Sequence, residues 1–476
     1  MKPSALAEGN VNELNPYVQG FYAAQPEEVT KTDLEVIGEL PTDLWGAYVR
    51  NGPNPFEVPD VPHHWFDGEG MVHSIYFENG KAEYRNRYVL SDDNVADMKG
   101  DGAEARGVLV PSNRDRPNKV YKDTANTDLV LHDGKLMALW YISGTPVRLD
   151  ARTLETLGNE DFGGKLPRNV SAHGKINPET GEFLFFDYSL YEPWMSFGVV
   201  SPKSELTHFA KIDLPGPRLP HDMGFTENYV ILHDLPVVFT ESGLRNGMWQ
   251  IKTEQRGARF GVVPRNGTND DVKWFETDPC YLYHVANSWE EGDEVVMVAC
   301  RMVPNNFDPD PAHGQFASMV NVMALHAYAW EWRMNMKTGE ITSRQLDDRL
   351  SEFPAINQDY AGRKTRYSYH VAMAHERLQR FEGLIKYDLE TGEKQEYLFE
   401  DGQGGSEPVF APRTGAKDED DGYVITFVTH TETGESEVLI LDAKKFADGP
   451  IARIPLPSRV PAGFHATWAD GDKIAA

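Results

Sequence analysis

Four histidines stand at nearly the same distance before a tight-turn signal in four separate parts of the chain. They are His173, His221, His284 and His465, and each lies six to eight residues before the glycine or asparagine of its turn. If the turns mark equivalent points of a repeated unit, the four imidazoles converge on one place. Neutral imidazole nitrogens are common ligands of iron, copper, zinc and nickel. The spacing therefore predicts a metal site built from four histidines.

The same spacing also admits a fifth histidine. His73 lies seven residues before Gly80, and its residue type does not separate it from the other four. Strands are short, so a shared phase also arises by coincidence. The residues by themselves leave His73 open as a ligand.

Tight-turn signals recur along the whole chain, and they mark the repeated strand units that must position the histidines. They are Asn79-Gly80, Asp133-Gly134, Thr180-Gly181, Glu227-Asn228, Glu291-Gly292, Thr338-Gly339, Thr391-Gly392 and Thr433-Gly434. Glycine supplies the positive φ that tight hairpin turns require. Short β-branched and aromatic runs, such as Tyr229–Asp234, Glu294–Cys300, Tyr423–Thr429 and Glu437–Leu441, read as strands. Successive signals lie 42 to 64 residues apart, and a propeller blade takes roughly 40–50 residues. The pattern predicts an all-β propeller of seven or eight blades, with two β-sandwiches as the alternative.

Composition narrows the function classes. The 476 residues carry 46 basic and 74 acidic side chains, a formal net charge of −28, which argues against binding nucleic acid or docking on anionic lipid. No signal peptide or run of about 18 apolar residues is visible, so we expect a cytoplasmic protein. The two cysteines are expected to be reduced thiols. The apolar run Pro193–Val200 is a candidate for weak membrane-surface association, although a buried strand is the favoured interpretation.

Longer stretches around these histidines resemble one known family. Gly46–Val89 reads GAYVRNGPNPFEVPDVPHHWFDGEGMVHSIYFENGKAEYRNRYV. ANT, SAHGK, PHDMGFTENY, YHVANSWE, EFPAIN, SEPVFAPR and GFHATW follow in order. Together they resemble the carotenoid cleavage oxygenase family, from about Leu34 to Trp468.

The resemblance implies a seven-bladed β-propeller, capped by loops and short helices over an axial metal site. We expect a single domain over residues 1–476, with residues 1–33 packing on or near the cap. The family's motifs place iron(II), Fe(2+), on His173, His221, His284 and His465, and they place no ligand at His73. They also place Glu352 and Glu407 behind the ligands, where a carboxylate fixes the tautomer of a bound histidine.

Several residues are expected around the metal by the same resemblance. A third glutamate of the family is missing, and Tyr141 stands at its position, either as a hydrogen-bond partner or in the substrate channel. Thr127 matches a threonine whose methyl group obstructs one coordination position. Because they adjoin these motifs or the loop-rich cap, we also place Phe66 at the reacting site and Trp140, Phe307 and Phe353 in a substrate tunnel.

The implied activity is a dioxygenase reaction, in which dioxygen adds across an electron-rich double bond and two carbonyl products form. The expected substrate is an apocarotenoid or carotenoid, because apolar Trp140 stands where stilbene cleavers are expected to carry a lysine. Cleavage of a stilbenoid or phenylpropenoid is the alternative. Two other classes remain: a non-catalytic propeller used for interaction, and a propeller hydrolase, whose divalent ion needs oxygen ligands. The oligomeric state is left open.

Overall fold

Eight β-sheets make up the computed structural model, which describes residues 9–57, 59–100, 107–111, 121–240, 251–253 and 256–474. Seven of them have four or more strands, and the eighth is a two-stranded ribbon. The first strands of neighbouring large sheets contact one another, as β6 contacts β10 and β33. The seven large sheets are the blades of a propeller. The expected seven-bladed, all-β fold is confirmed, and the two-sandwich alternative is wrong.

Five blades take their strands in chain order. These are β6 (Asp128–His132), β7 (Lys135–Leu139), β8 (Val147–Asp150) and β9 (Thr156–Asn159); β10 (Lys175–Ile176), β11 (Phe183–Tyr188), β12 (Met195–Val200) and β13 (Leu206–Ile212); β14 (Gly224–Phe225), β15 (Tyr229–Asp234), β18 (Ala258–Pro264) and β19 (Lys273–Thr277); β20 (Leu282–Glu291), β21 (Glu294–Met302), β22 (Ala327–Asn335) and β23 (Ile341–Gln345); and β24 (Ser351–Ala355), β25 (Tyr367–Met373), β26 (Phe381–Asp388) and β27 (Lys394–Leu398). The ribbon of β16 (Val237–Phe239) and β17 (Ile251–Thr253) is inserted between β15 and β18.

The last two blades join the two ends of the chain. One contains β33 (Ala466–Asp470), β3 (Gly46–Pro53), β4 (Gly70–Glu78), β5 (Lys81–Tyr88) and β1 (Thr30–Lys31); the other contains β28 (Gln403–Gly405), β29 (Val409–Pro412), β30 (Gly422–His430), β31 (Ser436–Asp442), β32 (Pro450–Pro455) and β2 (Ile37–Gly38). The C-terminal β33 pairs with the N-terminal β3, with Tyr48 opposite Trp468. Pairing of the chain ends within a blade closes the ring.

Burial explains why the middle strands are apolar on both faces. Blades pack face to face, so β30 is buried along nearly its whole length, whereas the outer strands β23 and β27 are mostly exposed. β12 is buried throughout, so the run from Pro193 contributes a buried strand, as favoured. Both cysteines, Cys280 and Cys300, are free and buried.

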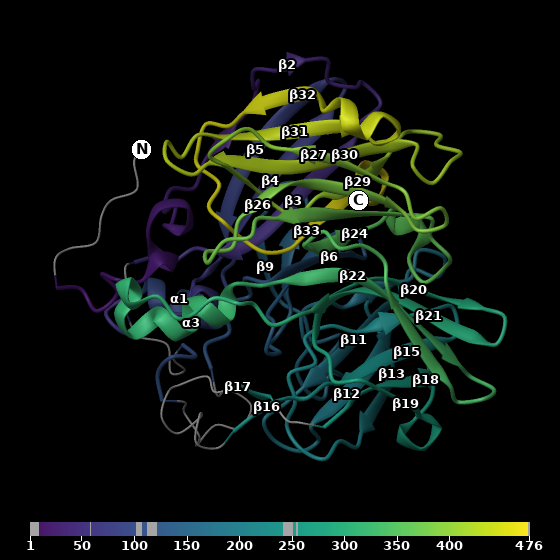
Figure 1. Ribbon diagram of the computed structural model, residues 1–476. Helices are drawn as coiled ribbons and strands as arrows, with labels where there is room; N and C mark the ends of the chain where they lie inside the picture. Colours follow the sequence, from purple (N-terminus) through teal and green to yellow (C-terminus); the bar gives the residue numbers. More distant parts are fainter. Residues whose placement is uncertain are drawn as a thin grey trace.

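Short helices and loops cover one side of the ring. They include η1 (Pro16–Val18), η2 (Gly20–Tyr22), η3 (Trp65–Asp67), α1 (Asp92–Met98), η5 (Pro311–Phe316) and α3 (Ala317–Met323). Figure 1 shows α1 and α3 on the same side of the molecule as the purple N-terminal segment. The other short helices are η4 (Asn269–Asp271), η6 (Gln358–Tyr360), η7 (Ala443–Asp448) and α4 (Gly471–Ile474). Within the described ranges, no helix has the length and apolar character needed to span a membrane.

The topology removes His73 from the axis. The turns after His173, His221 and His284 join the first and second strands of their blades, but Asn79-Gly80 joins β4 and β5, the third and fourth strands from the axis. His73 lies on β4, where its Nδ1 is 2.8 Å from the hydroxyl of Tyr84. It is a core residue of the blade.

Candidate metal centre

The four predicted histidines lie where the first strands of four blades begin. His173 and His221 precede β10 and β14, His284 is near the start of β20, and His465 directly precedes β33. Every one of the four side chains is buried. Since equivalent points of the first strands surround the axis, this placement gathers residues that are almost 300 positions apart in sequence.

The distances show that the imidazoles form one cluster. Candidate ligand atoms of His173, His221 and His284 all lie within 4.8 Å of one another. The ring centroid of His465 is 4.5 Å from those of His173 and His284. The ring centroids of His173 and His221 are 4.7 Å apart, and those of His221 and His284 are 5.2 Å apart. The structure therefore brings all four predicted residues together.

The ring nitrogens facing this cluster fit a bound ion. Nε2 of His173 and Nε2 of His284 are buried and have no hydrogen-bond partner among the described residues. Burial, followed by the neighbouring histidines, lowers the pKa of His173 well below its usual value. Burial has the same effect on the pKa of His221 and His284. Neutral rings keep a lone pair available, which is the form that binds a metal.

Carboxylates from neighbouring blades orient two of the rings. Oε2 of Glu352 lies 2.6 Å from Nδ1 of His284, and Oε1 of Glu407 lies 3.2 Å from Nδ1 of His465. A hydrogen bond at Nδ1 fixes the proton there and leaves Nε2 as the ligand atom. Burial opposes protonation of His465, but the carboxylate of Glu407 raises its pKa overall. Both glutamates thus lie behind predicted ligands, and their effect on a bound metal stays a prediction.

Backbone strain marks the same place. His173 and His221 have φ of 69° and 66°, in the left-handed region that costs free energy for residues other than glycine. The N–H of His173 donates to Oδ2 of Asp128 at 2.8 Å, across to the preceding blade. In the same way, the N–H of Val285 donates to Oδ2 of Asp222 at 2.7 Å. These carboxylates fix the backbone that carries the imidazoles.

An apolar cavity lies on one side of the histidines. It is lined by Trp65, Phe66, Thr127, Tyr141, His221, Tyr283, His284, Met323, Leu325, Phe353, Gln379, Phe464 and His465. Four residues predicted around the metal are among them: Phe66, Thr127, Tyr141 and Phe353. An apolar, mostly aromatic cavity beside the histidine cluster is a suitable binding site for an apolar molecule.

The hydroxyl of Thr127 is fully hydrogen-bonded, so it is not available to a molecule in the cavity. Its Oγ1 donates to Oδ1 of Asn126 at 2.9 Å and accepts from the N–H of Tyr141 at 3.1 Å. Because the hydroxyl is engaged in both directions, the methyl group is what the side chain offers to the cavity. The predicted obstruction of a coordination position by this methyl group stays a prediction.

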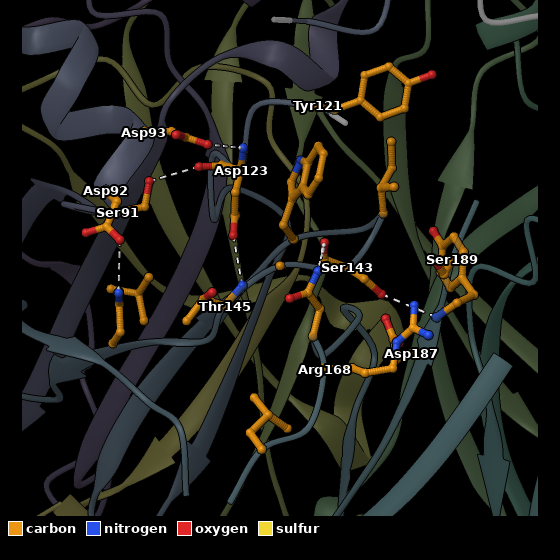
Figure 2. A pocket seen from close by; sticks show the side chains of 18 of the residues that line it. Ser91, Asp92, Asp93, Tyr121, Asp123, Ser143, Thr145, Arg168, Asp187 and Ser189 are labelled. Carbon is orange, nitrogen blue, oxygen red and sulfur yellow. Dashed lines mark hydrogen bonds and ion pairs between the residues drawn. The ribbon is translucent and has the colours of Figure 1, made fainter. Parts of the chain in front are cut away.

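Two other predicted tunnel residues lie elsewhere. Trp140 lines a separate polar cavity, with Arg168 and Asp187 in its wall at 3.0 Å from each other (Figure 2). Phe307 packs against His326 and His375, with ring centroids 5.4 and 5.1 Å away. Neither side chain lines the apolar cavity, so their tunnel roles stay predictions.

Comparison with known proteins decides the family. The family model described as "Retinal pigment epithelial membrane protein" matches residues 22–470. A carotenoid 9,10(9',10')-cleavage dioxygenase of Crocus sativus is 36% identical, over 96% of this chain and 90% of the relative. The chain belongs to the carotenoid cleavage oxygenase family. It is therefore an enzyme of the oxygenase class.

Solved structures of the family share the architecture. Lignostilbene dioxygenase of Pseudomonas brassicacearum superimposes with a TM-score of 0.85 and 29% identity, over 96% of this chain and 99% of that chain. Apocarotenoid oxygenase of Synechocystis, in a cobalt-substituted form, gives a TM-score of 0.82 and 27% identity, over 94% and 97% of the two chains.

A polar cavity lies on the other side of this oxygenase's histidines. It shares His173, His284 and His465 with the cluster and contains Asp128, Lys175 and Asp222. Nζ of Lys175 lies 2.8 Å from Oδ1 of Asp222. Sequence reasoning missed these charges, although Asp128 and Asp222 each follow a predicted site residue directly.

Aromatic residues of the centre were also missed. Tyr283 and Phe464 immediately precede His284 and His465 in sequence, and both line the apolar cavity. The aromatic–histidine pair was a visible signal. Trp65, Met323, Leu325 and Gln379 reach the cavity from the cap and from loops, where no periodic pattern marks them.

Proposed function

We propose that the chain is a non-haem iron(II) dioxygenase that cleaves a carbon–carbon double bond of an apocarotenoid or carotenoid into two carbonyl products. The observation that carries the proposal is the cluster of four buried histidines, three of which (His221, His284 and His465) line an apolar, aromatic cavity. The polar cluster suits a metal ion, and the cavity suits the alkene.

His173, His221, His284 and His465 would hold Fe(2+) in this proposal. An all-nitrogen, uncharged ligand set is compatible with iron and lacks the carboxylate of a facial triad. When bound, the ferrous ion would supply the electrons that activate dioxygen for reaction with an electron-rich double bond. Glu352 and Glu407 would keep two of the imidazoles in the binding tautomer.

The residues that line the cavity position the substrate. Phe66, Phe353 and Phe464 surround the site with apolar surface, which excludes water and holds a conjugated chain by contact. Phe353 is within 4.7 Å of His284 and 4.9 Å of His465, measured between ring centroids. A substrate double bond that packs against the Phe353 ring is held beside the metal ligands. Holding it there lowers the entropic part of the activation barrier.

A stilbenoid or phenylpropenoid is the second candidate substrate. The structural match to a lignostilbene dioxygenase favours it, and the match to a carotenoid 9,10(9',10')-cleavage dioxygenase favours the first. Both substrate types are apolar alkenes with extended conjugation, so the cavity's aromatic lining suits either one.

Metal analysis after anaerobic purification tests the proposal. We expect about one iron per chain and loss of that iron when His284 is replaced by alanine. Incubation with apocarotenals and, separately, with resveratrol should give aldehyde products identifiable by mass. A protein that binds no iron even after reconstitution would contradict the proposed iron(II) dioxygenase.

A further inference from the structure

One polar side chain in the wall of the apolar cavity has nothing to bind. Gln379 lies in the loop between β25 and β26, and its side chain is 6% exposed. Its Nε2 is buried without a hydrogen-bond partner among the described residues. The backbone is fixed, because the carbonyl oxygen of Gln379 accepts a hydrogen bond from the hydroxyl of Tyr22. A buried residue with a held backbone and an unpartnered side-chain donor therefore lines the apolar cavity.

A second idle donor lines the same cavity. Nε1 of Trp65 is buried and likewise lacks a partner within the described part of the chain. Its indole is held between aromatic rings: the centroid of Tyr22 is 5.1 Å away, and that of Phe464 is 4.6 Å away. Tyr22 thus contacts both donor-bearing residues, through its ring with Trp65 and through its hydroxyl with Gln379. The two donors belong to one small region of the cap.

Buried donors without acceptors are rare in folded proteins because each gives up its hydrogen bonds to water. Other buried donors of the described residues also lack acceptors, but these two belong to residues that line one cavity, where an acceptor that is not part of the chain can bind. That acceptor must belong to a largely apolar molecule, since the remaining lining, apart from Thr127 and three histidines of the cluster, is aromatic and aliphatic. An alkene with a carbonyl or hydroxyl oxygen meets both requirements.

We propose that Gln379 and Trp65 form a subsite for an oxygen atom of the substrate. The subsite rests on the proposed function and refines it. The cavity reaches from these donors to His221, His284 and His465, so an oxygen bound at the cap leaves the conjugated chain extending toward the metal ligands. The preferred substrate is then an oxygenated alkene, such as an apocarotenal or a phenolic stilbene, and not a pure hydrocarbon.

Equilibrium binding to the iron-free protein tests the subsite independently of catalysis. The probes are an apocarotenal against β-carotene, and 4-hydroxystilbene against unsubstituted trans-stilbene, followed by ligand absorbance. We expect the wild type to bind the oxygenated member of at least one pair about tenfold or more tightly, since a hydrogen-bonding site penalises an analogue that leaves it unpaired. Gln379→Met, which keeps the length and removes the amide, should lower that preference about tenfold by weakening only the oxygenated ligand.

Two further variants make the result decisive. Trp65→Phe keeps an aromatic ring and removes the N–H, so it should lower the preference in the same direction and also serves if Gln379→Met does not fold. Gln395→Met, on the exposed strand β27, is the matched control and should leave the preference unchanged. An unaltered preference in both folded cavity variants, or none in the wild type, would overturn the subsite. Absence of cleavage by iron-loaded wild type would count against the proposed function and leaves these binding ratios interpretable.

Discussion

Oε2 of Glu352 lies 2.6 Å from Nδ1 of His284, on the neighbouring blade. Both groups are buried, and the contact commits the proton of His284 to Nδ1. Nε2 is then left facing the histidine cluster with a free lone pair. The relationship shows how a propeller can orient a metal ligand: one blade carries the imidazole, and the next blade supplies a carboxyl that sets its tautomer once ionised, although burial raises the pKa of Glu352 to about 8.

Glu352→Gln should weaken metal retention about 10- to 100-fold, the usual effect of losing a carboxylate behind a metal-bound histidine. The amide preserves the shape but brings no negative charge. Retention is measured as iron per chain after dialysis against a graded chelator series. Glu432→Gln, at an exposed turn, is the matched control. Equal iron content in wild type and Glu352→Gln across the series would contradict this role.

Among the described residues, His221 has no carboxylate beside its ring, whereas Oδ2 of Asp128 lies 4.0 Å from Nδ1 of His173 and glutamates contact His284 and His465. Neither of its ring nitrogens makes a hydrogen bond to any residue that the structure describes. Its ring meets aromatic rings, with centroids of Tyr283 and Tyr141 at 4.6 and 6.5 Å. Burial raises the pKa of Tyr141 well above its usual value, so the phenol is uncharged. This face of the centre therefore lacks a supporting carboxylate.

Tyr141→Glu should raise iron retention by supplying that carboxylate, while lowering the melting temperature of the iron-free protein, because a buried charge without its partner is destabilising. Added iron should then produce a larger rise in melting temperature than in wild type. Tyr141→Phe tests the hydroxyl alone and should retain iron as wild type does. If neither substitution changes retention or activity, the position has no influence on the centre.

Two substitutions of Thr127 separate the effect of its hydroxyl from the effect of its methyl group. Thr127→Val removes the acceptor for the N–H of Tyr141, and a buried unsatisfied donor costs about 1–3 kcal/mol. Thr127→Ser keeps the hydrogen bonds and loses only a methyl group, which is expected to cost about 1 kcal/mol. Urea unfolding of the iron-free proteins measures both. If the methyl group shapes the reacting site, Thr127→Ser should alter the cleavage rate more than Thr127→Val; the opposite order would assign the effect to the hydroxyl.

The sequence predicted the fold and the histidines better than the cavity around them. Turn glycines signalled repeated hairpins, but Asn79-Gly80 and Thr180-Gly181 join different strand pairs within their blades. Blade number and the role of His73 were therefore undecided from spacing alone. Trp65 and Gln379 come from segments without periodicity, and only the folded cap brings them beside the histidines. Such contacts depend on tertiary packing, which spacing does not record.

Asp187, in the wall of the cavity that Trp140 lines, should make stability depend on pH. Burial raises its pKa to about 6, although Arg168 at 3.0 Å opposes the shift. A carboxyl whose folded pKa lies above its unfolded value binds its proton more tightly in the folded state. Its stabilising contribution is complete below about pH 4 and disappears as the pH rises through about 6, a change of up to about 3 kcal/mol. Asp187→Asn cannot titrate, so its unfolding free energy should fall less than that of wild type between pH 4 and 7. Urea unfolding of the iron-free proteins at both pH values gives the difference, and parallel pH profiles for the two would show that the Asp187 carboxyl is ionised throughout.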